Sequence, residues 1–226
     1  MARGVLVTGT DTGVGKSVVA ATLLYALKLR RFRACGMKPV ASGCEEGEDG
    51  LRNGDAQLLL TQSSHPVAYD RVNRYRFAPA IAPHIAAQQV GVTISVESIV
   101  ADYHRMAAEV EWVVVEGVGG WRVPLNDNET VADLAQALAL PLVVVVGIRL
   151  GAINHALLTL QAIAADGMTV AGWVASVVDP QMAEISGNVE AIAARTAVPH
   201  LGTIPYLQPP TVDQVLPSLQ LDPIFR

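Results

Sequence analysis

The sequence is poor in cysteine, in aromatic residues and in charge. Its 226 residues include two cysteines, 5% aromatic residues and 16% charged residues, whereas 51% are hydrophobic. Two cysteines offer no disulfide framework, and no Cys or His spacing matches a zinc site. Low charge combined with high hydrophobic content is the opposite of a disordered composition. We therefore expect a folded chain whose thiols stay reduced.

Basic residues are too few for a nucleic-acid or membrane surface. The formal net charge is −5, and both kinds of surface need concentrated Lys and Arg. The longest apolar stretch, Ala137–Ile148, is interrupted by Pro141, and a bilayer-spanning helix needs about 20 residues. The first ten residues lack the long apolar segment of a secretory signal. These absences predict a cytoplasmic protein with neither a nucleic-acid nor a membrane partner.

Short β-branched runs alternate with longer runs of helical apolar spacing. Strands are predicted at Gly4–Thr8, Ala34–Pro39, Trp112–Glu116, Leu142–Gly147 and Val170–Val177, and helices at Ser17–Arg30, Asp55–Gln62, Val96–Val110, Val131–Leu138, Ile153–Ala165 and Ala183–Arg195. Such alternation is typical of βαβ units. It predicts one α/β domain over residues 1–226, with a mostly parallel central sheet and helices on both faces.

Two loops in this pattern are candidates for function. Residues 41–54 are rich in glycine and acidic side chains, and residues 117–128 open with Gly-Val-Gly-Gly. Ligands of open α/β sheets bind beyond the carboxyl ends of the strands. We therefore expect both loops to meet the first loop of the chain at one crevice.

The segment GTDTGVGKS at residues 9–17 lies between a predicted strand and a predicted helix. In a phosphate-binding loop, glycines let backbone N–H groups turn towards phosphates, Lys16 reaches the outer phosphates and Ser17 ligates Mg²⁺. Five residues separate Gly9 from Gly15, so the usual four-residue spacing begins at Thr10 instead. The alternative is a glycine-rich turn with an incidental lysine, which its strand–helix context disfavours.

Two further strand ends add charge near this loop. Glu116 ends an apolar strand and is a candidate Mg²⁺ ligand, with the Ser17 hydroxyl and one more carboxylate completing the protein ligands. Lys38 ends another predicted strand, where a lysine stabilises the anion that develops in phosphoryl transfer. Taken alone, Glu116 could be a solvated strand end and Lys38 a surface cation.

Five segments together resemble the dethiobiotin synthetase family of the P-loop NTPase superfamily. They are the loop at residues 9–17, MKPVASG at 37–43, Gly54-Asp55, VVVEGVGGW at 113–121 and LGAINHALLT at 150–159. They follow the family's order, and KPVASG with the later EGVGG and LGAINH is more specific than a P-loop alone. The resemblance implies a ligase that converts 7,8-diaminononanoate, CO₂ and ATP into dethiobiotin, ADP and phosphate, with Mg²⁺ as cofactor.

The resemblance also implies roles for individual residues. Lys16 and Lys38 would be catalytic, and Ser17, Asp55 and Glu116 would surround Mg²⁺. The ATP site would comprise Thr12, Gly13, Val14, Gly15, Lys16, Ser17, Asp55, Glu116, Gly117, Val118, Gly119, Ser176, Val177, Pro205, Tyr206 and Leu207. Thr12, Ser42, Gly151, Ala152, Ile153 and Asn154 would contact the substrate, the last four from the neighbouring subunit of a homodimer.

At one of these positions the chain departs from the family pattern. Members commonly carry Asn after GWVA, whereas this chain has Ser176. A hydroxyl cannot form the paired donor and acceptor contact of an amide with adenine. We therefore expect weaker discrimination between bases.

Two other functions share a P-loop and stay open at this stage. One is a partner-driven ATPase switch, although such proteins carry a second lysine early in the loop and Gly9–Thr12 has none. The other is a nucleotide-sensing module without catalysis, because a P-loop alone proves only binding.

Overall fold

The computed structural model describes residues 3–225, which build one six-stranded parallel sheet. Its strands are β1 (Arg3–Gly9), β2 (Ala34–Met37), β7 (Trp112–Glu116), β8 (Leu142–Ile148), β9 (Val170–Val177) and β10 (His200–Ile204). Their order is β10-β9-β8-β1-β7-β2. Parallel neighbours bring all carboxyl ends to one edge, where the loops predicted to be functional begin.

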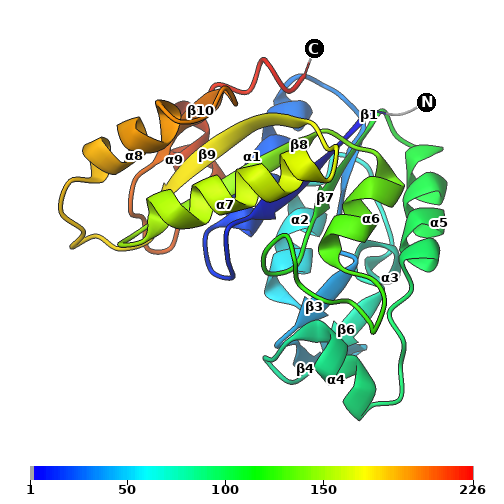
Figure 1. Ribbon diagram of the computed structural model, residues 1–226. Coiled ribbons are helices and arrows are strands. Elements are labelled where there is room, and N and C mark those ends of the chain that lie inside the picture. Colours follow the sequence, from blue (N-terminus) through cyan, green and yellow to red (C-terminus); the bar gives the residue numbers. More distant parts are fainter. Residues whose placement is uncertain (1–2, 226) are drawn as a thin grey trace.

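Helices cover both faces of this sheet (Figure 1). In chain order the helices of the described residues are α1 (Lys16–Leu29), α2 (Gly54–Gln62), α3 (Tyr69–Val72), α4 (Pro83–Gln89), α5 (Val96–Ala107), α6 (Val131–Leu138), α7 (Ala152–Ala165), α8 (Ile185–Ala193) and α9 (Val212–Val215), followed by a 3₁₀ turn at Leu216–Ser218. Figure 1 shows α5, α6 and α7 in front of the sheet and α1 behind it. Among residues 3–225, no helix is long and apolar enough to cross a bilayer.

The two-residue period of the strands divides the core into two layers. In β1, Val5 and Val7 face the layer that contains α1, whereas Leu6 faces the layer that contains α5, α6 and α7. All three side chains are fully buried. The strands are apolar throughout because both faces of the sheet are covered.

A small lobe extends from the carboxyl edge of the sheet. It contains β3 (Val40–Ser42) paired in parallel with β6 (Tyr75–Phe77), the hairpin of β4 (Glu45–Gly47) and β5 (Gly50–Arg52), and α4. Figure 1 shows this lobe at the bottom of the view. The lobe forms one wall of the cavity described below.

The predicted elements are confirmed with small shifts at their ends. The predictions for β7, β9 and α6 match exactly at both ends. The strand predicted at Ala34–Pro39 stops at Met37, because the Lys38 N–H donates to the Val72 carbonyl at 2.8 Å instead of continuing the sheet. The helices predicted at Val96–Val110 and Ala183–Arg195 are shorter, ending at Ala107 and Ala193.

Several elements were not predicted. They are β3, β4, β5, β6, β10, α3, α4 and α9. Most span three or four residues, too few to show a period. In β10, Gly202 interrupts a run with only two large apolar side chains. The segment predicted as a loop at residues 41–54 holds the β4–β5 hairpin, in which β4 is exposed, β5 is half-buried and neither strand has an apolar alternation.

We predict that Gly202→Ala destabilises the fold. Gly202 has φ 142°, and a Cβ there would lie 1.9 Å from the Ser218 carbonyl oxygen, where the C-terminal segment pairs with β10. Urea unfolding should show that the free energy of unfolding falls by about 2 kcal/mol or more. The control Gly187→Ala lies in the exposed part of α8, where a Cβ would make only ordinary van der Waals contact with the Glu184 side chain, so it should stabilise by about 0.5–1 kcal/mol. Equal stability of wild type and Gly202→Ala would contradict the prediction.

Candidate functional site

Residues 9–17 form a tight turn between β1 and α1. Gly13 and Gly15 have φ 73° and 94°, conformations that residues with a side chain seldom adopt. A Cβ on Gly15 would also lie 2.9 Å from the Ser176 hydroxyl. Val14 buries its side chain, and a Cβ on Gly9 would lie 2.8 Å from it. The turn is therefore packed from behind, while Gly13 and Gly15 face a cavity.

Lys16 lies buried within this turn. Its Nζ donates to the Asp11 carbonyl oxygen at 2.6 Å. The Asp11 carboxylate accepts from the Thr12 N–H at 2.7 Å and forms an ion pair with Arg149. Burial, with a smaller contribution from the charge of Lys38, lowers the pKa of Lys16 to about 8. Burial thus disfavours the charged form of Lys16, and a bound polyphosphate would stabilise that form.

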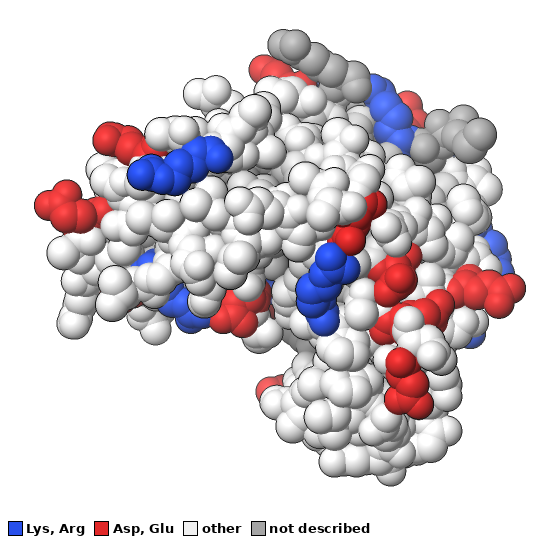
Figure 2. Space-filling model, in the orientation of Figure 1, with Lys and Arg blue, Asp and Glu red and all other residues white. Residues whose placement is uncertain are grey.

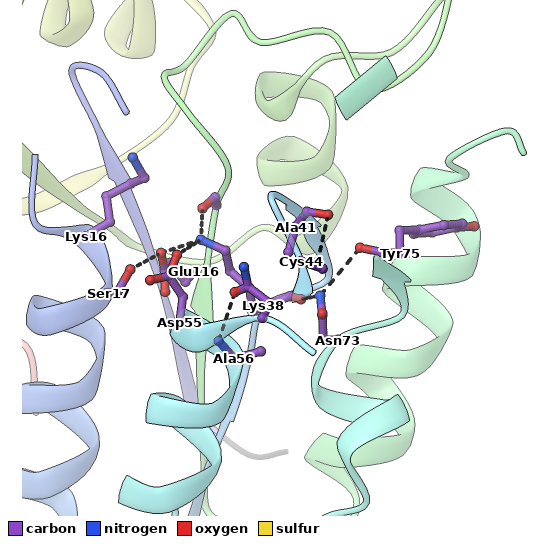
Figure 3. Close-up of polar contacts among 12 residues, drawn as sticks. Lys16, Ser17, Lys38, Ala41, Cys44, Asp55, Ala56, Asn73, Tyr75 and Glu116 are labelled. Atoms are coloured by element: carbon purple, nitrogen blue, oxygen red, sulfur yellow. Dashed lines mark hydrogen bonds and ion pairs between the residues drawn. The ribbon is translucent and has the colours of Figure 1, made fainter. Parts of the chain in front are cut away.

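Lys38 and Glu116 form a buried ion pair next to the P-loop (Figure 3). Lys38 Nζ also lies 3.3 Å from Asp55 Oδ2 and donates to the Gly117 carbonyl oxygen at 3.2 Å. The Ser17 hydroxyl donates to Glu116 Oε1 at 2.8 Å. Burial alone would lower the pKa of Lys38, but the two carboxylates outweigh it and raise that pKa. Lys38 therefore stays charged.

The backbone around this ion pair is held by two buried asparagines. Asn73 Nδ2 donates to the Lys38 carbonyl oxygen at 2.6 Å. Asn53 caps α2, accepting from the Ala56 N–H at 3.2 Å, and thereby places Asp55 in the first turn of that helix. A carboxylate in the first helical turn also has a favourable interaction with the helix dipole. Lys38 and Asp55 thus have little freedom to move.

A cavity of about 650 Å³ brings these groups together. It is lined by Thr12, Gly13, Gly15, Lys16, Ser17, Lys38, Ala41, Ser42, Asn53, Asp55, Ala80, Ile81, Ala82, Pro83, Glu116, Val118, Gly119 and Val123. One end is polar and carries both lysines and both carboxylates. The residues from 80 to 83 and the two valines form apolar walls. The shape and polarity suit a ligand with a charged head and an aliphatic part.

The oxygen ligands at the polar end fit Mg²⁺. Glu116 Oε2 is buried and has no hydrogen-bond partner within the described residues 3–225. The Ser17 hydroxyl and the half-exposed Asp55 carboxylate lie beside it. Burial raises the pKa of Glu116, and Lys38 and Ser17 act against that rise. A hard divalent cation prefers such oxygens and would favour the ionised carboxylate.

The other predicted residues differ in where the structure places them. Thr12, Ser42, Val118 and Gly119 line the cavity, and the buried Ser42 hydroxyl has no hydrogen-bond partner in the part of the chain described. The N–H of Gly117, a residue that the resemblance assigns to the ATP site, donates to the Val7 carbonyl at 2.9 Å, so it belongs to the hydrogen bonding of the sheet. The carbonyl of Gly117 is the atom that faces the site.

The remaining predicted residues lie outside this cavity. Ser176 and Val177 end β9, and Ser176 pairs with Ile204, directly before Pro205, Tyr206 and Leu207. These five residues, which the resemblance assigns to the ATP site, therefore share one corner of the carboxyl edge, behind the P-loop. Gly151, Ala152, Ile153 and Asn154 open α7 and do not line the cavity in this single chain.

Sequence reasoning missed several residues that shape the site. Residues 80–83 lie in a segment without periodicity and become a wall only because the lobe folds over the sheet. No motif or cap position in the sequence marks Asn73 as part of the site. Asn53 could have been found, since an Asn directly before a predicted helix is a typical N-cap.

Comparisons with known proteins identify the family of this chain. A family model described as an AAA domain matches residues 3–213. The ATP-dependent dethiobiotin synthetase of Pseudomonas aeruginosa is 49% identical, with 96% of each chain covered. The chain belongs to the ATP-dependent dethiobiotin synthetase family. Its relative of the same name from Cellvibrio japonicus is 46% identical over 99% of this chain and 98% of that protein. In Xanthomonas oryzae the family member is 50% identical, covering 88% of this chain and 89% of its own.

Solved structures with lower identity share the fold. The septum site-determining protein MinD of Pyrococcus horikoshii, solved with Mg-ADP, superposes with a TM-score of 0.58 at 11% identity, covering 97% of this chain and 87% of that one. The signal recognition particle receptor FtsY of Elizabethkingia anophelis gives 0.56 at 16% identity, covering 100% and 66%. At these identities the likeness concerns architecture alone. It confirms the predicted P-loop NTPase fold.

We predict that Lys16→Met stabilises the nucleotide-free protein at pH 7, by roughly 1–3 kcal/mol. The pKa of Lys16 is about 8 when folded against 10.5 for the unperturbed group, so the unfolded chain binds more protons between these values. Stability conferred by the wild-type lysine therefore rises with pH in that window. The advantage of Lys16→Met should be full below pH 8 and shrink towards pH 10.5.

Urea unfolding at pH 7 and pH 9.5 measures this advantage. The exposed Lys28, at the other end of α1, supplies the matched control Lys28→Met, which should change stability little at either pH. A destabilised Lys16→Met at pH 7 would contradict the prediction.

Proposed function

We propose that this chain catalyses the ATP-dependent carboxylation and ring closure of 7,8-diaminononanoate to dethiobiotin. Membership of the family supports the reaction. Support from the geometry comes from one observation above all: a buried lysine, two carboxylates and a P-loop meet in one cavity that also has apolar walls.

The reaction needs three steps. One substrate amine adds to CO₂ and loses a proton, giving a carbamate. A carbamate oxygen attacks the γ-phosphorus of ATP, the bond from that phosphorus to the bridging oxygen of ADP breaks, and a carbamic–phosphoric anhydride forms. The second amine then attacks the carbonyl carbon and loses a proton, the C–O bond to phosphate breaks, and a cyclic urea forms with release of phosphate. No amino-acid nucleophile is required.

In this proposal the residues position charge rather than form bonds. Lys16 binds the outer phosphates through the P-loop, and Lys38 stabilises the carbamate and the transferring phosphoryl group. The Ser42 hydroxyl, which has no hydrogen-bond partner among the described residues, contacts the substrate from the cavity wall. Thr12, in the P-loop, contacts the substrate from another part of the cavity lining. The apolar walls accommodate the aliphatic chain of the diamine and exclude water from the anhydride.

Ser17, Asp55 and Glu116 would hold Mg²⁺. The ion supplies charge neutralisation of the phosphates when bound. The unpartnered oxygen of Glu116 supports this assignment.

The base of ATP would be bound by Ser176, Val177, Pro205, Tyr206 and Leu207. The single hydroxyl of Ser176 predicts weak discrimination between bases. Two free thiols, Cys35 and Cys44, are consistent with the reducing cytoplasm as its location.

The direct test is product formation from labelled bicarbonate, the diamine, ATP and Mg²⁺. The wild type should make a labelled cyclic urea. Lys16→Ala and Lys38→Ala should each lower kcat/KM at least about 100-fold, because each removes a charge that stabilises developing anions. Lys28→Ala, on the exposed end of α1, should retain wild-type activity. ATP hydrolysis that is independent of the diamine, with no cyclic urea, would refute the proposed reaction.

We also propose a homodimer that forms across α7. This 14-residue helix contains no charged residue, and Leu150 and Leu158 are 93% and 57% exposed. Figure 2 shows that the surface over α7 is largely free of charged side chains. In such a dimer Gly151, Ala152, Ile153 and Asn154 would complete the partner's substrate site, with the positive end of the helix facing the substrate carboxylate.

Leu158→Glu should therefore convert the protein to a monomer in sedimentation velocity and lower its activity. The reason is that a carboxylate would be buried without a partner at the interface. Leu29→Glu is the matched control, since Leu29 is 58% exposed but ends α1 on the opposite face of the sheet. A fully active wild-type monomer would contradict the dimer.

A further inference from the structure

The segment after β7, residues 117–123, forms a wall of the active cavity and is here called the glycine loop. Val118, Gly119 and Val123 line the cavity, and the carbonyl oxygen of Gly117 accepts a hydrogen bond from Lys38. The position of this loop therefore sets one of the contacts of the proposed catalytic lysine.

Asp166 contacts the far end of the glycine loop. It is the residue directly after α7, far from the loop in sequence. Asp166 Oδ2 accepts from the Trp121 indole N–H at 2.6 Å, and Oδ1 accepts from Arg122 at 2.9 Å. Both carboxylate oxygens are thus used by adjacent residues of the loop. The Asp166 backbone carbonyl accepts from Gln136 of α6 at 3.0 Å, which fixes Asp166 itself.

Burial makes the contact with Trp121 stronger than a surface contact. The Trp121 side chain packs in the core layer with α5, α6 and α7, and the Asp166 side chain is only 17% exposed. Without Asp166, the indole N–H of Trp121 would be a buried donor with no partner in the described structure, which costs about 1–3 kcal/mol. Arg122 is 58% exposed, so its ion pair with Asp166 contributes little.

Helix stability does not explain an aspartate at this position. The C-terminus of a helix carries partial negative charge, and a carboxylate there is unfavourable. The carboxylate is turned instead to the glycine loop. The glycine loop is also tightly packed within itself. Gly119 has φ 59°, and a Cβ there would lie 2.7 Å from the Val123 side chain.

We propose that Asp166 is a positioning residue for the reaction: through Trp121 it holds the glycine loop so that the Gly117 carbonyl and the loop's cavity-lining residues meet Lys38 and the substrate. The inference rests on the proposed function. It places a determinant of catalysis at the end of α7, outside the cavity, where no residue touches a reactant.

The test uses steady-state cyclic urea formation by the full-length protein. Asp166→Ala should lower kcat about tenfold, because small displacements of positioned groups have effects of this size. The KM for ATP should change less than about twofold, since the P-loop is untouched. Asp166→Asn keeps an acceptor for Trp121 and should retain most activity. Asp222→Ala, which removes a surface ion pair with Arg30, is the matched control and should match the wild type.

A double-mutant cycle with Trp121→Phe decides whether the two residues act together. Phe keeps an aromatic ring, although a smaller one than the indole, and lacks the N–H donor, so Trp121→Phe should reproduce the loss in kcat. The double variant should be no worse than either single one. If Asp166→Ala fails to fold, Asp166→Asn and Trp121→Phe still decide the matter through kcat.

The inference is overturned if Asp166→Ala or a folded Trp121→Phe turns over at the wild-type rate, or if the two losses add. It is also overturned if the KM for ATP rises in step with the fall in kcat. Failure of the proposed function would look different, because the wild type itself would then form no cyclic urea.

Discussion

The buried ion pair between Lys38 and Glu116 is the constraint on which the site depends. Each side chain alone would be a charge removed from water, and breaking such a pair typically costs 3–5 kcal/mol. Lys38 follows β2 and Glu116 ends β7, so the pair forms only when these neighbouring strands are in register. Ser17 and Asp55 then complete the polar cluster from the first turns of α1 and α2.

Contacts outside the cavity hold this cluster in place. Asn73 fixes the backbone of Lys38, and Asp11 links the P-loop to Arg149 at the end of β8. Asp166 holds the glycine loop from the end of α7. The first of these is fully buried, the second half-exposed and the third mostly buried, so their contributions to rigidity differ. Preorganisation of this kind matters most where a reaction depends on placing charge.

The fold itself carries little information about the reaction. A protein with the name of a septum site-determining factor has the same architecture at 11% identity. The features that this chain brings to the cavity are local: the lysine after β2, the serine at the end of β3 and the wall that the lobe forms. The proposed function rests on this set of side chains and not on the sheet that supports them.

The sequence by itself determined the parallel α/β architecture, the P-loop, and Lys38, Asp55 and Glu116 as members of one site. These follow from patterns within a few residues of each other, namely apolar periodicity, glycine spacing and polar residues at strand ends. Only the tertiary structure decided that residues 80–83 form a cavity wall, that Asn73 holds Lys38 and that Asp166 binds Trp121. The last two contacts join residues 35 and 45 positions apart in the sequence. No local pattern marks any of these arrangements, because they exist only once the chain has folded.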